Sequence, residues 1–79
     1  MNSIELGNAV RFHRKKGGLT QQQLATLAGV GKTVVFDLEK GKQSVQMDTV
    51  MKILNVLNIR LKIESPLMQE YSTQHEDEE

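Results

Sequence analysis

Glycines limit how long any helix in the first 58 residues can be. Gly17-Gly18, Gly29 and Gly41 each follow a short amphipathic segment, and glycine is the residue that most readily ends a helix. Asn58 can adopt the left-handed conformation that closes a further helix. The spacing of apolar residues therefore predicts a small all-α bundle of about four helices. The expected helices cover residues 3–16, 20–28, 32–40 and 46–57.

The second expected helix carries a specific start signal. In Thr20-Gln21-Gln22-Gln23 the Thr20 hydroxyl can accept from the Gln23 backbone N–H, while the Gln23 side chain reaches back to Thr20. The three glutamines thus form a first helical turn rather than a low-complexity tract. The side chains expected to face the core are Leu6, Val10, partly His13, Leu24, Leu27, Ala28, Val30, Val35, Leu38, Met47, Val50, Ile53, Leu54 and Leu57.

The period of the sequence changes after Asn58. Residues 59–63 alternate apolar and basic, which is typical of a strand with one buried face. Because the chain offers no second strand candidate, we expect residues 59–64 to pair with the same strand of a second copy. The strand residues expected in this dimer are Ile59, Leu61 and Ile63. Pro66 ends the strand, and residues 65–79 are predicted to be an acidic, disordered tail.

The zero net charge hides an uneven distribution. Residues 1–63 hold ten Lys and Arg against four acids, a balance of +6, whereas residues 64–79 hold six acids and no Lys or Arg, a balance of −6. A basic body attracts polyanions, and an acidic tail can pair with a basic partner.

Several classes of protein are excluded by composition. The absence of cysteine removes disulfides, thiol nucleophiles and thiolate metal sites, and suits the cytoplasm. No apolar run is long enough to cross a membrane, and the N-terminus shows no signal-peptide pattern. His13 and His75 have no third ligand beside them, and no nucleophile–base pair is apparent. We expect no metal, no cofactor and no catalytic residue.

The stretch Ala28-Gly-Val-Gly-Lys-Thr-Val-Val resembles the end of a nucleotide-binding phosphate loop. That loop requires an earlier glycine at position 26, where this chain has Thr26, and a buried strand before it. Here the preceding segment is a capped helix, so the nucleotide interpretation fails on its context. Two short helices joined by a tight turn explain the same residues: Gly29 reverses the chain, Val30 enters the core, and Gly31 caps the next helix. This is a helix-turn-helix motif.

The pattern around this motif resembles the Cro/cI/Xre family of helix-turn-helix repressors over residues 5–58. The residues that carry the resemblance are 18–25, 28–30, Val35 and 38–42. The resemblance implies a DNA-binding domain over residues 1–58. An added strand and a short tail are similar to HipB-type antitoxins, which repress their own operon and bind a HipA-like kinase toxin.

The resemblance also implies roles for individual residues. Gln21, and less directly Gln22, would contact backbone phosphate, while Lys32, Thr33 and Phe36 would meet base edges or sugars in the major groove. Lys40 and Lys42 match positions that contact the DNA backbone. Arg14 and Glu39 match a structural ion pair. The role of Asp37, an acid among these cations, stays open, because it can accept from cytosine or pair with a neighbouring cation.

The leading interpretation is a homodimeric repressor of a palindromic operator that also serves as the antitoxin of a HipA-like kinase. Two alternatives stay open. One is a stand-alone autoregulatory repressor without a toxin, and the other is a module that uses the same helices for protein contact.

Overall fold

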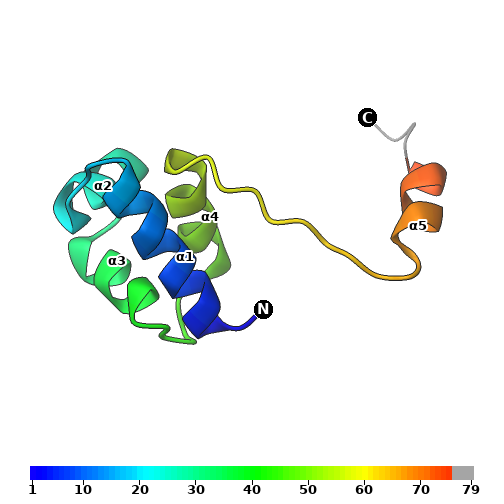
Figure 1. Cartoon of the computed structure of the whole chain (residues 1–79), viewed down its shortest axis with the longest axis horizontal. Coiled ribbons are helices and arrows are strands. Elements are labelled where there is room, and N and C mark those ends of the chain that lie inside the picture. The colour runs from blue at the N-terminus through cyan, green and yellow to red at the C-terminus, as the bar shows by residue number, and fades with distance from the viewer. Residues whose placement is uncertain (76–79) are drawn as a thin grey trace.

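Four short helices pack around one apolar core, and a fifth lies apart from them at the end of an extended segment (Figure 1). The computed structural model describes residues 1–75. The helices are α1 (Ser3–Lys16), α2 (Gln21–Ala28), α3 (Lys32–Glu39), α4 (Met47–Val56) and α5 (Met68–His75). The first four confirm the predicted bundle, with ends within one residue of those expected from the sequence.

The helix ends follow the local chemistry of the sequence. Thr20 and Gln23 form the predicted capping box, with the Gln23 N–H donating to Thr20 Oγ1 at 3.0 Å and the Thr20 N–H donating to Gln23 Oε1 at 2.8 Å. Gly29 closes α2 in the left-handed region at φ 71°, and Asn58 follows α4 at φ 56°. Gly31 begins α3 with no side-chain cap, as its sequence predicts.

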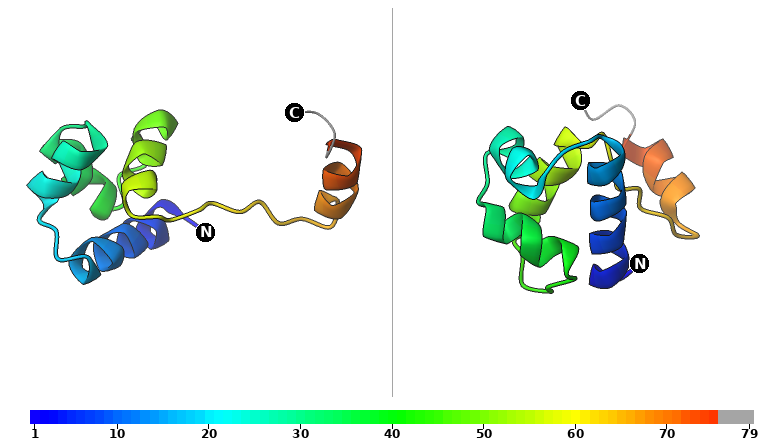
Figure 2. Two further views of the ribbon diagram at one scale, coloured as in Figure 1. Left: turned by 90° about the horizontal axis from the view of Figure 1, so that it is seen from above. Right: turned by 60° about the vertical axis from the view of Figure 1, so that its left-hand side comes forward.

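The core lies where α2 meets α3 and α4, while α1 packs across α3. Figure 2 shows the same arrangement from two further directions, with α5 well separated from the bundle when it is seen from above. The buried apolar side chains are Val10, Leu24, Ala25, Val35, Leu38, Val50, Ile53 and Leu54. All of these except Ala25 were expected from the spacing of apolar residues.

Three side chains expected in the core are instead exposed. Leu27 is 62% exposed because the buried face of α2 centres on Leu24, Ala25 and Ala28, so that Leu27 points to the other side. Met47 is 67% exposed because it occupies the first position of α4, at the edge of its apolar face. His13 lies on the outer side of α1, where its Nδ1 donates to the Ala9 carbonyl oxygen at 2.6 Å.

The predicted strand at residues 59–63 does not form. This segment is extended, and no strand occurs within residues 1–75. A strand needs a neighbouring strand with which to form a ladder of backbone hydrogen bonds, and a single chain offers none. The prediction depended on a second copy for the same reason. Ile59 nevertheless packs against the core, and its N–H donates to the Leu54 carbonyl oxygen at 2.9 Å.

The prediction of a disordered tail is wrong for residues 68–75, which form α5. Ser65 and Pro66 account for the helix: the Leu67 N–H donates to Ser65 Oγ at 3.3 Å, and the Met68 N–H donates to the Ser65 carbonyl oxygen at 3.2 Å. Serine before proline can start a helix as well as end the extended segment before it. The part of the prediction that concerns 76–79 lies outside the described residues.

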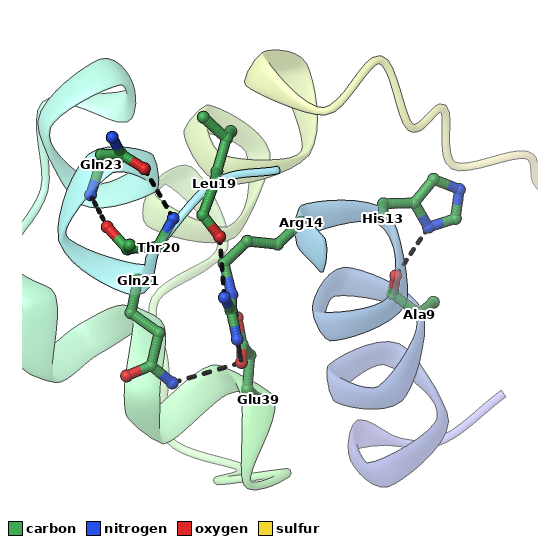
Figure 3. A network of polar contacts seen from close by, with 8 residues as sticks. All are labelled: Ala9, His13, Arg14, Leu19, Thr20, Gln21, Gln23 and Glu39. Carbon is green, nitrogen blue, oxygen red and sulfur yellow. Dashed lines mark hydrogen bonds and ion pairs between the residues drawn. The ribbon is translucent and has the colours of Figure 1, made fainter. Parts of the chain in front are cut away.

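A buried ion pair joins α1 to the end of α3 (Figure 3). Arg14 donates from Nε to Glu39 Oε2 at 2.6 Å and from Nη2 to Glu39 Oε1 at 2.9 Å. Its Nη1 donates to the Leu19 carbonyl oxygen at 2.9 Å, so the same guanidinium also holds the loop that leads into α2. The two side chains are only 10% and 3% exposed. Bidentate geometry of this kind fixes direction as well as distance.

The environment of Arg14 keeps it charged. The hydrogen bond with Glu39 raises the pKa of Arg14 above its ordinary value; burial of the guanidinium opposes this shift, and the negative charge of Glu39 adds to it. Because the pKa of Arg14 is raised from a value that is already high, the guanidinium stays protonated in the folded protein at any physiological pH.

Gly7 allows α1 to cross α3 at backbone contact. A Cβ atom built on Gly7 would collide with the Leu38 carbonyl oxygen and would lie 2.9 Å from the Glu39 carbonyl oxygen. These are backbone atoms that cannot rotate away. No role was predicted for Gly7, because no neighbouring residue in the sequence indicates that the backbone of α3 lies against it.

We expect Gly7→Ala to destabilise the fold by about 1–3 kcal/mol, because the added methyl group forces α1 away from α3. Gly17→Ala is the matched control: Gly17 has φ −79°, and the nearest atom to an added Cβ is at 3.4 Å. Urea denaturation followed by circular dichroism measures both. Equal stability of the two variants would contradict the close approach.

We expect Arg14→Met to lower the free energy of unfolding by about 3–5 kcal/mol, because it leaves Glu39 buried without its cation. Replacing both residues by methionine should recover much of this loss, since no unpaired charge remains. Lys42→Met, which breaks a surface pair, is the control and should cost less than about 1 kcal/mol. If Arg14→Met costs no more than Lys42→Met, the buried pair does not hold the helices together.

Candidate nucleic-acid interface

The turn between α2 and α3 sets the direction of α3. Gly29 reverses the chain, and the Val30 N–H donates back to the Ala25 carbonyl oxygen at 3.0 Å. The Val30 side chain packs against the core from the turn itself. Gly31 is extended and leads directly into Lys32. Since no strand precedes this turn, the structure agrees with the rejection of the phosphate-loop interpretation.

One face of α3 is buried and the opposite face is open. Val35 and Leu38 lie in the core, whereas Lys32, Thr33 and Phe36 are exposed. Phe36 is 46% exposed, and the Nζ of Lys40 lies 5.4 Å from the centre of its ring. An aromatic ring held at the surface by a neighbouring cation is available to a ligand. The three residues implied to read bases therefore lie on the same open side of the helix.

Asp37 is partnered by Lys42 beyond the end of α3. Lys42 Nζ lies 3.4 Å from Asp37 Oδ2, and the Lys42 N–H donates to the Asp37 carbonyl oxygen at 3.0 Å. The Lys42 side chain is 54% exposed, so the pair adds little stability. Its consequence is local: the one acid on the open side of α3 has a cation beside it. The sequence left two possible roles for Asp37, a contact with cytosine or a pair with a neighbouring cation. The structure shows the pair with a cation.

Gln21 is held by the buried ion pair. Its Nε2 donates to Glu39 Oε1 at 3.3 Å, which places the side chain between α2 and the end of α3 (Figure 3). Gln22 is exposed, and its Nε2 donates to Thr26 Oγ1 at 3.2 Å within α2. The two glutamines thus differ: Gln21 belongs to the network that links three helices, and Gln22 lies on the outer side of α2.

A polar groove brings some of the expected residues together. Gln21, Phe36 and Lys40 line it, whereas Gln22, Lys32, Thr33 and Lys42 lie outside it. The other lining residues come from α1 and from the ion pair, and they are Asn8, Arg11, Arg14, Lys15 and Glu39.

Three residues of α1 in this groove had no predicted place at a site. Asn8, Arg11 and Lys15 are spaced by three and four residues, which puts them on one side of a helix. The sequence shows this spacing and the basic character of the second half of α1. Only the packing of α1 on α3 shows which way that side faces.

The described chain shows neither a membrane span nor a metal centre. No helix within residues 1–75 is both long and apolar enough to cross a bilayer. In the same residues, no three His, Cys, Asp or Glu side chains gather in a way that suits a metal ion.

The chain is similar in sequence to known regulators. A helix-turn-helix family model matches residues 10–63. An uncharacterized HTH-type transcriptional regulator of Sinorhizobium fredii is 39% identical over 62 residues, which are 78% of this chain and 82% of that protein. The competence pilus inhibition repressor of Acinetobacter baylyi is 48% identical over 40 residues, which are 51% of this chain but only 36% of the repressor.

Solved structures share the fold. A HipB variant in an O2 20mer complex and HipB in an O4 20mer complex match with TM-scores of 0.76 and 0.75, each at 24% identity over 84% of this chain and more than nine-tenths of the other. At this identity the likeness establishes the arrangement of helices. The family match and the likeness to the Sinorhizobium fredii regulator show that the chain belongs to the Cro/cI/Xre-type helix-turn-helix family of transcriptional regulators.

Proposed function

We propose that the protein is a homodimeric, sequence-specific repressor that binds a palindromic operator in the cytoplasm through α3. The observation that carries the proposal is the open face of α3, where Lys32, Thr33 and Phe36 are exposed while Val35 and Leu38 anchor the opposite face. A helix presented in this way fits the major groove of DNA. One relative is named a repressor, which supports repression rather than activation.

The chemistry of the open face suggests which contacts it makes. Lys32 can donate to guanine O6 and N7, and the Thr33 methyl group can pack on the methyl group of thymine. Phe36 offers an apolar edge to a base or sugar. Contacts with backbone phosphates require hydrogen-bond donors or positive charge. The residues that would supply them near Lys32, Thr33 and Phe36 are Gln21, Gln22, Lys40 and Lys42. Base-reading residues are thus separate from the residues that position the protein.

Residues 59–63 support the dimer. Their backbone is extended and has no strand beside it within residues 1–75, and Ile63 is 74% exposed. Pairing with the same segment of a second copy would complete the hydrogen bonds and cover Leu61 and Ile63. A two-fold axis between the strands gives two copies of α3, as a palindromic operator needs.

The tail supports a partner of opposite charge. Leu67 and Tyr71 are 67% and 53% exposed; they lie at and near the start of α5, which stands apart from the bundle (Figure 1). Residues 64–79 are also strongly acidic. We propose that this segment binds a basic surface on a HipA-like kinase toxin, which would make the protein the antitoxin of that pair. Without such a partner, the protein is a stand-alone autoregulatory repressor.

Lys32→Ala should weaken binding to the operator by about fivefold or more and relax the preference for guanine at one position, because a bidentate base contact contributes about 1–3 kcal/mol. Gln21→Ala should weaken binding to all sequences alike, because it removes a phosphate contact. Lys52→Ala removes the same charge from the exposed side of α4 and is the control. Fluorescence anisotropy on the DNA upstream of the gene measures the effect. Unchanged affinity in the first two variants would refute the assignment.

A nuclease footprint on the same upstream DNA, with and without the product of the adjacent gene, tests the whole proposal. We expect two protected half-sites about one helical turn apart, with stronger protection when the neighbouring product is present. If the protection is the same with and without this product, the result would favour the stand-alone repressor. No protection in either case would exclude repression of its own gene.

A further inference from the structure

The groove between α1 and α3 carries an excess of positive charge. Four cations line it, Arg11, Arg14, Lys15 and Lys40, against one carboxylate, Glu39. Glu39 is already engaged by Arg14. Arg11 and Lys15 have no ion-pair partner within residues 1–75, and Lys40 lies over the ring of Phe36. Three positive charges are therefore available to a ligand of opposite charge.

The wall formed by α1 is held in place. Asn8, Arg11 and Lys15 are exposed and lie beside the buried side of α1, which contains Gly7 and Arg14. Gly7 lets the two backbones touch, and Arg14 ties α1 to the end of α3. The exposed cations of α1 thus keep a fixed relation to the opposite wall of the groove.

We propose that this groove binds phosphates of the DNA backbone, so that the DNA contact extends from α2 and α3 onto α1 through Arg11 and Lys15. The inference rests on the proposed binding of DNA by α3. The groove shares Gln21 and Lys40 with that surface, so a strand that meets these residues passes beside α1. Its lining combines amide and cationic donors with one aromatic ring, and its one carboxylate, Glu39, is neutralised by Arg14; this chemistry suits phosphate and not an apolar ligand.

The contact is nonspecific in sequence and dependent on salt. Each lysine or arginine that neutralises a phosphate steepens the fall of affinity with salt. Removing two such contacts should reduce the loss of affinity between about 50 and about 200 mM salt by about tenfold. The reduction should be the same on operator DNA and on a scrambled duplex, because phosphates carry no sequence information.

The test compares the full-length protein with Arg11→Ala, Lys15→Ala and the double variant, and uses Lys52→Ala as the control for a lost surface charge. Fluorescence anisotropy is measured over a series of salt concentrations on both duplexes. We expect the slope of log K against log salt to fall by about one for each removed contact, and to stay unchanged in Lys52→Ala. Circular dichroism should show intact folding, since both side chains are exposed.

Two results would overturn the inference. If the slopes of the α1 variants equal that of the unmodified protein while Lys32→Ala still weakens binding, the groove takes no phosphate although α3 binds DNA. If the α1 variants bind DNA more tightly, the groove instead holds a competing acidic segment, for which the tail of the chain is the nearest source. Failure of Lys32→Ala and of every α1 variant to alter binding would be a failure of the proposed function itself.

Discussion

The buried contact between Arg14 and Glu39 connects nearly every part of the bundle. It joins α1 to the end of α3, and Arg14 also holds the loop at Leu19 before α2. Gln21 reaches the same carboxylate from α2. Eight buried apolar residues make only a small core, and apolar contacts alone constrain direction weakly. A bidentate pair adds geometric specificity to the relative placement of the helices that it joins. The geometry of the open face of α3 therefore depends on a polar interaction behind it.

In α3, the side chains that support the helix are separate from those that we propose contact DNA. Val35 and Leu38 fix α3 from behind, and Gly29 sets its entry angle, so that Lys32, Thr33 and Phe36 need serve no structural purpose. On the other side of the ion pair, α1 presents Arg11 and Lys15 in a fixed relation to α3. A regulator built in this way can change the exposed side chains of α3 without disturbing its fold, because the exposed and the buried side chains lie on opposite faces of the same helix.

The charges of the sequence are divided between a basic bundle and an acidic segment that follows it. Most of the Lys and Arg residues belong to the bundle, whereas six of the ten Asp and Glu residues come after Ile63. Figures 1 and 2 show α5 apart from the four-helix bundle. This separation keeps the groove and α3 open to a polyanion. It also leaves α5 accessible, as the basic partner that we propose for it requires.

Local chemistry was sufficient for much of this structure. The capping box at Thr20, the left-handed Gly29 and the alternation of Val35 and Leu38 with exposed neighbours are all decided within one or two helical turns, so the sequence alone determined the four helices, most of the core and the helix-turn-helix. Tertiary packing decided the rest, since it depends on which surfaces meet. Only the crossing of α1 over α3 reveals the need for Gly7, turns Arg11 and Lys15 toward Gln21, and leaves His13 outside. The strand expected at residues 59–63 did not form for the same reason: a strand exists only beside a partner, and one chain supplies none.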